Sequence, residues 1–308
     1  MKTFEVIFPI FLTGMIGWLL VKSRIINEHE RNGLSKITFL VFVPMLLFQG
    51  TYSAKDFGEI SAGYVLAFYI PVLSLYLLSR IVFNKFLFQS KNEASFAGLG
   101  TSYSNVVLVG IPVLLNYLGD AAIVPAFFII SVHSIILFTL TSYFTETTKK
   151  SSPGFKNLAR ALIFALKNPL VSSLMLGISF NYFDIALPDT IVSVITLVSK
   201  AALPSALIVL GGALAAYPLV ANLRASLIIC VLKLGILPLL VWLFATRLFH
   251  LNSFLSTVIV VLASTPVGVN VYALARDHQK IAPVIAASIL LSTLMAIFTI
   301  PFWLYIIR

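Results

Sequence analysis

Long apolar runs alternate along the chain with short segments that are polar or rich in Gly and Pro. Each run lasts about twenty residues, which is the length that a helix needs to cross a bilayer. The strands of a membrane β-barrel would instead alternate apolar and polar residues over about ten residues. The pattern predicts ten spanning helices, at about 4–21, 34–51, 61–83, 94–119, 121–145, 165–183, 190–216, 224–249, 253–278 and 280–307. We therefore expect an all-α polytopic membrane protein.

Composition supports this fold class and narrows the function. Hydrophobic residues make up 59% of the chain, charged residues 10%, and the mean hydropathy is +1.02. A soluble domain carries roughly 25% charged residues. The single cysteine, Cys230, excludes disulfides within the chain and cysteine-based metal sites. Metalloprotease, serine-hydrolase and phosphate-loop motifs are not found, so we expect no enzyme activity, no cofactor and no bound metal.

The net charge of +10 comes from Lys and Arg residues that lie between the apolar runs rather than on one basic face. This distribution indicates orientation in a membrane and no nucleic-acid partner. With an external amino terminus, 15 of the 21 basic residues lie on the inner side, four on the outer side and two within spans. Short loops rich in Lys and Arg stay in the cytoplasm. The sequence thus predicts a multi-pass cell-membrane protein with both termini outside.

The longest polar connector divides the chain into two halves of five spans. We expect a first repeat at 1–145, a cytoplasmic linker at 146–164 and a second repeat at 165–308. Several residues recur between the halves at offsets of 158 to 167, among them Pro9, Met15, Gly17 and Pro44 with Pro169, Met175, Gly177 and Pro204. Because five is odd, the halves enter the membrane in opposite directions. This is the inverted-repeat architecture of secondary transporters.

Two spans, the fourth of each half, contain residues that interrupt helices. The first interruption runs from Ser102 to Pro112 and the second from Ser264 to Asn270. Irregular backbone at membrane depth is tolerated where it packs in protein or lines a wet cavity. Two interrupted helices that cross would present half-helix amino termini, which favour an anion. The alternative is that Pro112 and Pro266 merely kink packed helices.

Three ionisable residues fall within predicted spans. Lys200 and Lys233 could balance an anionic substrate or cap unwound carbonyl groups, or extend toward the membrane interface. His133 could relay a proton or form a structural hydrogen bond. All eleven acidic residues lie in loops or at helix ends, which disfavours a carboxylate-based cation site and leaves sodium bound by carbonyl, Asn or Ser oxygens possible. The Gly211-Gly212 pair indicates close helix packing.

Specific motifs resemble the auxin efflux carrier family, whose plant members are the PIN transporters. They are Ser102-x-x-Asn105 followed by Gly110-x-Pro112, and Ala263-Ser264-Thr265-Pro266 in the ninth span. The resemblance covers essentially the whole chain. It implies a fold like that of bile-acid and sodium/proton exchanger transporters, with a scaffold domain, a transport domain and elevator-type alternating access. It also implies a homodimer through the scaffold.

The resemblance places Asn105 and Pro112 at the crossing of the fourth and ninth helices, with Pro266 as their partner. Plant auxin carriers often have a long central loop, whereas the loop here is short. Auxin is therefore not the expected substrate, and short-loop relatives are similar to bacterial permeases for malate or malonate. The resemblance thus favours a small carboxylate as the substrate.

Together these observations predict a secondary carrier for a small organic anion. The expected substrate-binding residues are Ser102, Ser104, Asn105, Pro112, Lys200, Lys233, Thr265, Pro266 and Asn270, with His133 as a candidate for ion coupling. A membrane receptor that binds the anion without moving it would use the same pocket, but no signalling domain is evident. A channel is a third alternative, although no ring-forming filter motif is found.

Overall fold

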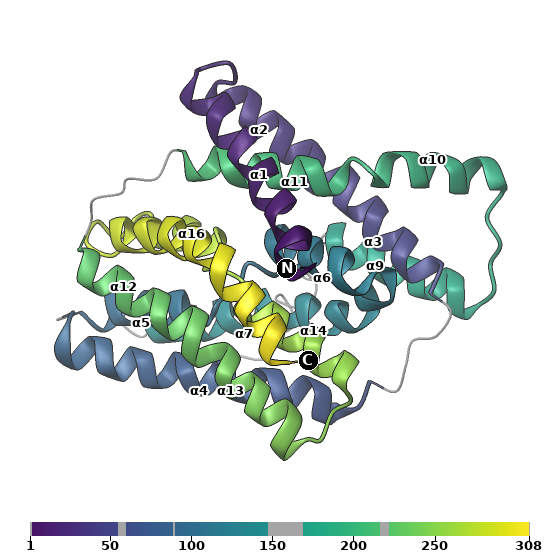
Figure 1. The fold of residues 1–308 in the computed structure, drawn as a ribbon. Coiled ribbons are helices and arrows are strands. Elements are labelled where there is room, and N and C mark those ends of the chain that lie inside the picture. Colours follow the sequence, from purple (N-terminus) through teal and green to yellow (C-terminus); the bar gives the residue numbers. More distant parts are fainter. Residues whose placement is uncertain (1, 55–59, 89, 147–168, 216–221, 308) are drawn as a thin grey trace.

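The computed structural model describes residues 2–54, 60–88, 90–146, 169–215 and 222–307 (Figure 1). Within these ranges every regular element is a helix. The first half contains α1 (Lys2–Lys22), α2 (Glu28–Ile37), η1 (Thr38–Phe42), α3 (Val43–Tyr52), α4 (Ala62–Phe86), α5 (Lys91–Ser102), η2 (Val106–Gly110), α6 (Ile111–Leu118), η3 (Asp120–Ala122) and α7 (Ile123–Glu146). The linker was predicted at 146–164. Apart from Glu146 it lies within 147–168, outside the described residues.

The second half has the same helical character. It contains α9 (Pro169–Tyr182), α10 (Asp189–Ser199), α11 (Ala202–Leu214), α12 (Leu223–Val231), η4 (Leu232–Ile236), α13 (Leu237–Leu243), η5 (Phe244–Leu248), α14 (Ser253–Ser264), α15 (Asn270–Ala275) and α16 (Ala282–Ile306). The elements η1, η2, η4 and η5 are single π-helical turns: η1 and η4 lie inside longer helices, η2 begins one and η5 ends one. Such turns are rare and often occur at functional sites.

Six helical runs in the described residues are long and apolar enough to cross a membrane. They are Glu28–Tyr52, Ala62–Phe86, Asp120–Thr145, Asp189–Leu214, Leu223–Leu248 and Ala282–Ile306. Three further apolar helices are shorter, at Phe8–Lys22, Val106–Leu118 and Ser253–Ser264. Two of these three are short because the chain leaves the helical path next to them. The membrane-protein class is therefore established, while the count of ten spans stays a prediction.

The helices pack in two sets, and each set draws on both halves of the chain. In the first set α1 lies along α11, and α3 lies along α9 and α10. In the second set α4 lies along α5, α12 along α16 and α13 along α14, with α7 against α5. Figure 1 shows the first set across the upper and right part of the view and the second set below it. Residues far apart in sequence thus form each set.

Small residues bring α1 and α11 into close contact. A Cβ atom at Gly211 would overlap the carbonyl group of Gly14, and a Cβ atom at Gly17 would overlap the carbonyl group of Ile208. Both neighbours are backbone atoms, which cannot swing aside as a side chain can. The Gly211-Gly212 pair therefore serves helix packing, as the sequence indicated.

We expect Gly211→Ala to destabilise the protein, because the added methyl group must push two backbones apart. Overpacking of this kind costs about 1–3 kcal/mol and occasionally more. Thermal unfolding in detergent should show a clearly lower Tm for the variant. Gly33→Ala is the matched control, because Gly33 is exposed and a Cβ atom there meets nothing within 4 Å. Equal melting temperatures for the two variants would contradict the packing argument.

Candidate functional site

The first helix interruption lies between α5 and η2. Helix α5 ends at Ser102, and Tyr103 to Asn105 form a short non-helical segment before the π-helical turn of η2. The backbone at Tyr103 is extended, with φ −83° and ψ 111°. Pro112 lies further along, inside the continuous helix Val106–Leu118 and directly after the π-helical turn η2, and such π-helical adjustments accommodate a proline in a membrane helix. Pro112 therefore lies after the interruption, inside the next helix, rather than at the crossing where it was expected.

The second interruption lies between α14 and α15. Helix α14 ends at Ser264, Thr265 is extended with φ −66° and ψ 153°, and the next helix begins at Asn270. Pro266 has no N–H group to continue the helical hydrogen bonds. Ser264, Thr265 and Pro266 are all buried, so this irregular backbone is enclosed in protein.

The two interruptions run antiparallel and pair with each other. Ser104 and Val267 form an isolated antiparallel bridge. The Asn105 N–H donates to the Pro266 carbonyl at 2.9 Å, and the Gly268 N–H donates to the Tyr103 carbonyl at 3.0 Å. We call this paired segment, residues 103–105 with 265–268, the crossover. The two interruptions therefore contact each other directly, which argues against the alternative that the two prolines merely kink separate helices.

Side chains from three other helices satisfy backbone groups that the crossover leaves free. His133 of α7 accepts the Ser104 N–H on Nε2 at 3.0 Å, and Ser292 of α16 accepts the Val267 N–H on Oγ at 3.0 Å. Lys233 of η4 donates from Nζ to the carbonyl groups of Ala263 and Thr265, both at 2.6 Å. Buried backbone groups need such partners, above all at membrane depth.

Hydrogen-bond donors at the crossover remain without acceptors. Ser104 Oγ, Asn105 Nδ2 and His133 Nδ1 are buried and have no partner among the described residues. Because His133 Nε2 accepts a hydrogen bond, a neutral imidazole carries its proton on Nδ1. All three atoms can therefore donate. A buried donor without an acceptor is costly, so each of these groups calls for a ligand or another explanation.

Lys233 and Lys200, which the sequence could not distinguish, occupy different places. Lys233 is completely buried and caps the carbonyl groups at the end of α14, which was one of the roles expected for it. Lys200 is exposed at the end of α10, directly before α11. It lines a cleft whose lining includes neither Asn105 nor Pro266. Of these two lysines, only Lys233 belongs to the crossover.

The remaining predicted residues lie at or next to the crossover. Ser102 is buried in the last turn of α5, with Oγ 3.4 Å from Thr101 Oγ1. Thr265 donates from Oγ1 to the Leu262 carbonyl at 2.8 Å, while its own carbonyl accepts from Lys233. Asn270 is exposed at the start of α15, and its Nδ2 lies 3.4 Å from Tyr103 Oη.

Three residues that hold the crossover were not identified from the sequence. Tyr103 stacks on His133 with ring centroids 4.8 Å apart, and its hydroxyl lies 2.7 Å from Ser134 Oγ. Ser292 supports Val267, as described above. Polar side chains within otherwise apolar spans were the available signal for Ser134 and Ser292. Tyr103 gave no such signal beyond its place next to Ser104.

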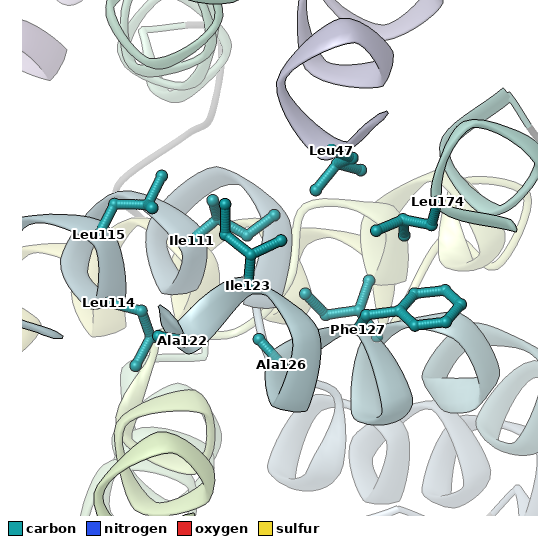
Figure 2. Close-up of a pocket in the computed structure, with 10 residues that line it drawn as sticks. Leu47, Ile111, Leu114, Leu115, Ala122, Ile123, Ala126, Phe127 and Leu174 are labelled. Carbon is teal, nitrogen blue, oxygen red and sulfur yellow. The ribbon is translucent and has the colours of Figure 1, made fainter. Parts of the chain in front are cut away.

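An apolar cavity and a polar cleft lie where the two helix sets meet. Figure 2 shows the cavity, which is lined only by hydrocarbon side chains of α3, η3, α6, α7 and α9. Its volume is about 10 Å³, room for one water molecule at most, and it offers no polar partner. The cavity is therefore not a site for an anion.

The cleft is larger, with a volume of about 910 Å³, and lies between α3 and α10 on one side and α6 and α7 on the other. Its polar lining includes Gln49, Ser53, Asn116, Asp120, Thr196, Ser199 and Lys200. Gln49 is held by hydrogen bonds to Thr196 at 2.9 Å and Ser199 at 2.6 Å. This cleft can admit a polar solute between the helix sets.

Comparison with known proteins agrees with a transport function. The chain is 25% identical over 310 residues to a protein of Rhizobium meliloti (strain 1021) named "Putative malonate transporter", covering 98% of this chain and 95% of the relative. It is 23% identical to an "Uncharacterized transporter" of Methanothermobacter thermautotrophicus (strain ATCC 29096), covering 98% of each. The profile of the family described as membrane transport protein matches residues 2–304. The chain therefore belongs to this membrane transport protein family, the auxin efflux carrier family that its motifs resemble.

Proposed function

We propose that the protein is a secondary carrier for a small organic anion that binds at the crossover. The observation that carries this proposal is the group of three buried donors without acceptors, on Ser104, Asn105 and His133. A carboxylate accepts hydrogen bonds only, so it matches a site made of donors. In this role His133 donates to the substrate from Nδ1, while Nε2 stays bound to the Ser104 N–H.

A carboxylate is the substrate class that the surrounding chemistry favours. The half-helix that begins at Val106 directs its first N–H groups toward the crossover, and such helix ends favour anions. Lys233 adds a basic side chain that donates a hydrogen bond to the same segment. The relative named for malonate makes a small dicarboxylate the first substrate to test.

Movement of one helix set against the other would give alternating access. In this proposal α1–α3 and α9–α11 form the scaffold, and the set that contains the crossover forms the transport domain. Supporting it, a small apolar cluster of Val43, Leu47, Ile111, Ile123, Phe127, Leu174 and Ala202 lies between the sets. Apolar contacts of this kind have no directional bonds to break when surfaces slide. The polar cleft with Lys200 would then be the route by which the anion reaches the crossover.

Equivalent contacts in the two halves support the inverted repeat, 1–145 with 165–308. Gly17 lies against the carbonyl of Ile208, and Gly177 lies against the carbonyl of Phe48. Residues 17 and 177 differ by 160, and so do 48 and 208. Adding 160 to residue 17 and subtracting 160 from residue 208 thus converts the first contact into the second. This relation is expected for two repeated halves that pack against each other.

A second pair of contacts obeys the same offset. The carbonyl of Gly14 faces Gly211, and the carbonyl of Leu174 accepts from Thr51 Oγ1 at 3.4 Å. Residues 14 and 174 differ by 160, as do 51 and 211. The proposal therefore keeps ten spans in two opposed repeats. It also keeps both termini outside, and a homodimer through the scaffold as the family resemblance implies.

The test is transport of radiolabelled malonate by the purified protein in liposomes. A carrier should show saturable flux that is stimulated by unlabelled substrate on the opposite side. With a negative interior, each exported charge gains about 2.3 kcal/mol per 100 mV, so imposed potentials should change net flux. Protein-free liposomes are the control.

The two alternatives give different results in this assay. A receptor would bind carboxylates, seen as a rise in Tm through mass action, without any flux. A channel would conduct without stimulation from the opposite side. Binding without flux over a panel of mono- and dicarboxylates would rule out the carrier.

A further inference from the structure

The side chain of Lys233 enters the crossover from a neighbouring helix. Lys233 lies in the π-helical turn η4, is 0% exposed, and donates two hydrogen bonds of 2.6 Å from Nζ. Its acceptors, the carbonyl groups of Ala263 and Thr265, stand at the carboxyl end of α14, where the helix has no further N–H groups to offer them. A positive charge is favourable at this end of a helix dipole.

Carbonyl groups at such an interruption are the ligands that secondary transporters use to bind a coupling cation. Unwound backbone and half-helix carboxyl ends coordinate sodium or protons in these folds. In this protein two of those oxygens already accept hydrogen bonds from the terminal amino group of Lys233. This amino group is attached to the chain by its own side chain, so it cannot leave during a transport cycle.

We propose that Lys233 is a tethered cation that occupies the place of a coupling sodium ion, so that transport by this protein is independent of sodium. This inference rests on the proposed carrier function. Lys233 acts as a positioning residue: it fixes the Thr265 carbonyl, and the adjoining Pro266 carbonyl accepts the Asn105 N–H at 2.9 Å. Its ammonium group thereby orders the backbone that carries a substrate donor.

If Lys233 takes the place of a sodium ion, malonate flux and Tm should not depend on sodium. In wild-type protein, replacing sodium by choline should change neither malonate flux at a fixed potential nor the Tm. In Lys233→Ala, both carbonyl groups lose their donor and a space the size of a propylammonium ion opens beside them. Flux should fall more than tenfold, and n-propylammonium or sodium should restore part of the flux and raise the Tm of this variant alone.

Controls separate the tether from a general effect of losing a lysine. Lys36→Ala removes an exposed lysine of α2 and should keep wild-type flux and show no response to propylammonium. Lys233→Arg keeps a cation and should retain more flux than Lys233→Ala. If Lys233→Ala cannot be purified, the comparison of Lys233→Arg with wild type replaces it, and a sodium requirement of the wild-type flux would still refute the inference.

Two results would overturn the inference while the carrier function stands. One is wild-type malonate flux that requires sodium, and the other is Lys233→Ala flux equal to wild type in sodium-free buffer. Conversely, a Lys233→Ala Tm that rises with propylammonium, in a protein that moves no carboxylate, would support the tether and refute the carrier. The Tm readout uses no substrate, so the two failures are distinguishable.

Discussion

Asn105→Ala should lose most of the malonate transport and still fold. The side chain contributes a buried donor, Nδ2, that has no partner among the described residues. The backbone of Asn105 donates to Pro266 across the crossover and accepts from Val109 and Gly110 in the helical turn that follows, and alanine keeps these bonds. A hydrogen bond to a charged group contributes about 1.5–3 kcal/mol, so we expect roughly 10- to 100-fold weaker binding in thermal-shift and flux titrations.

Two further variants make this result specific. Asn105→Asp keeps the shape of the side chain but replaces a donor by a negative charge, so it should impair anion transport more than alanine does. Asn32→Ala applies the alanine substitution at an exposed asparagine of α2 and should transport like wild type. Wild-type affinity in Asn105→Asp would refute an anion at the crossover, whatever the alanine variant does.

The helix interruptions could be read from the sequence because their causes are local. Asn105 and Pro266 disfavour a continuous helix through their own side chains, whatever surrounds them. The structure indeed departs from helix at both places. Pro112 was expected at the crossing, but it lies inside the continuous helix Val106–Leu118, directly after the π-helical turn η2. Local π-helical adjustments let membrane helices accommodate a proline, so the proline alone did not locate the interruption.

The groups that support the crossover could not be read in the same way. His133, Lys233 and Ser292 reach it from α7, η4 and α16, which lie far away in sequence. Their roles depend on which helix faces which, and a periodicity of apolar residues fixes no such pairing. The sequence therefore identified His133 and Lys233 as unusual, but left open what they contact.

The two lysines illustrate the limit of counting residues along a span. Lys200 and Lys233 lie at similar depths from the ends of their predicted helices, so both received the same alternatives. Lys200 lies between two helices, because α10 ends at Ser199 and α11 starts at Ala202. Lys200 is exposed and lines the cleft, whereas the side chain of Lys233 is fully buried. Depth alone did not determine burial.

The aromatic wall of the crossover explains why a single methyl group there should have a large effect. Tyr103 is fixed on three sides: its ring stacks on His133 and on Phe138, each with centroids 4.8 Å apart, and its hydroxyl lies 2.7 Å from Ser134 Oγ. Gly268 faces this ring, and a Cβ atom at Gly268 would overlap it. The ring has nowhere to move without breaking these contacts.

Gly268→Ala should therefore separate the paired interruptions and abolish most transport. The added Cβ atom would overlap the Tyr103 ring and lie 3.3 Å from the Ser104 carbonyl oxygen, next to the Gly268 N–H that bonds to Tyr103. Overpacking costs about 1–3 kcal/mol, so the Tm should fall together with malonate flux. Gly33→Ala adds the same methyl group at an exposed helical position and should leave flux unchanged with an equal or higher Tm. Wild-type flux in Gly268→Ala would mean that transport does not depend on the close pairing of Tyr103 to Asn105 with Thr265 to Gly268. The binding site would then have to be sought elsewhere, first in the cleft around Lys200.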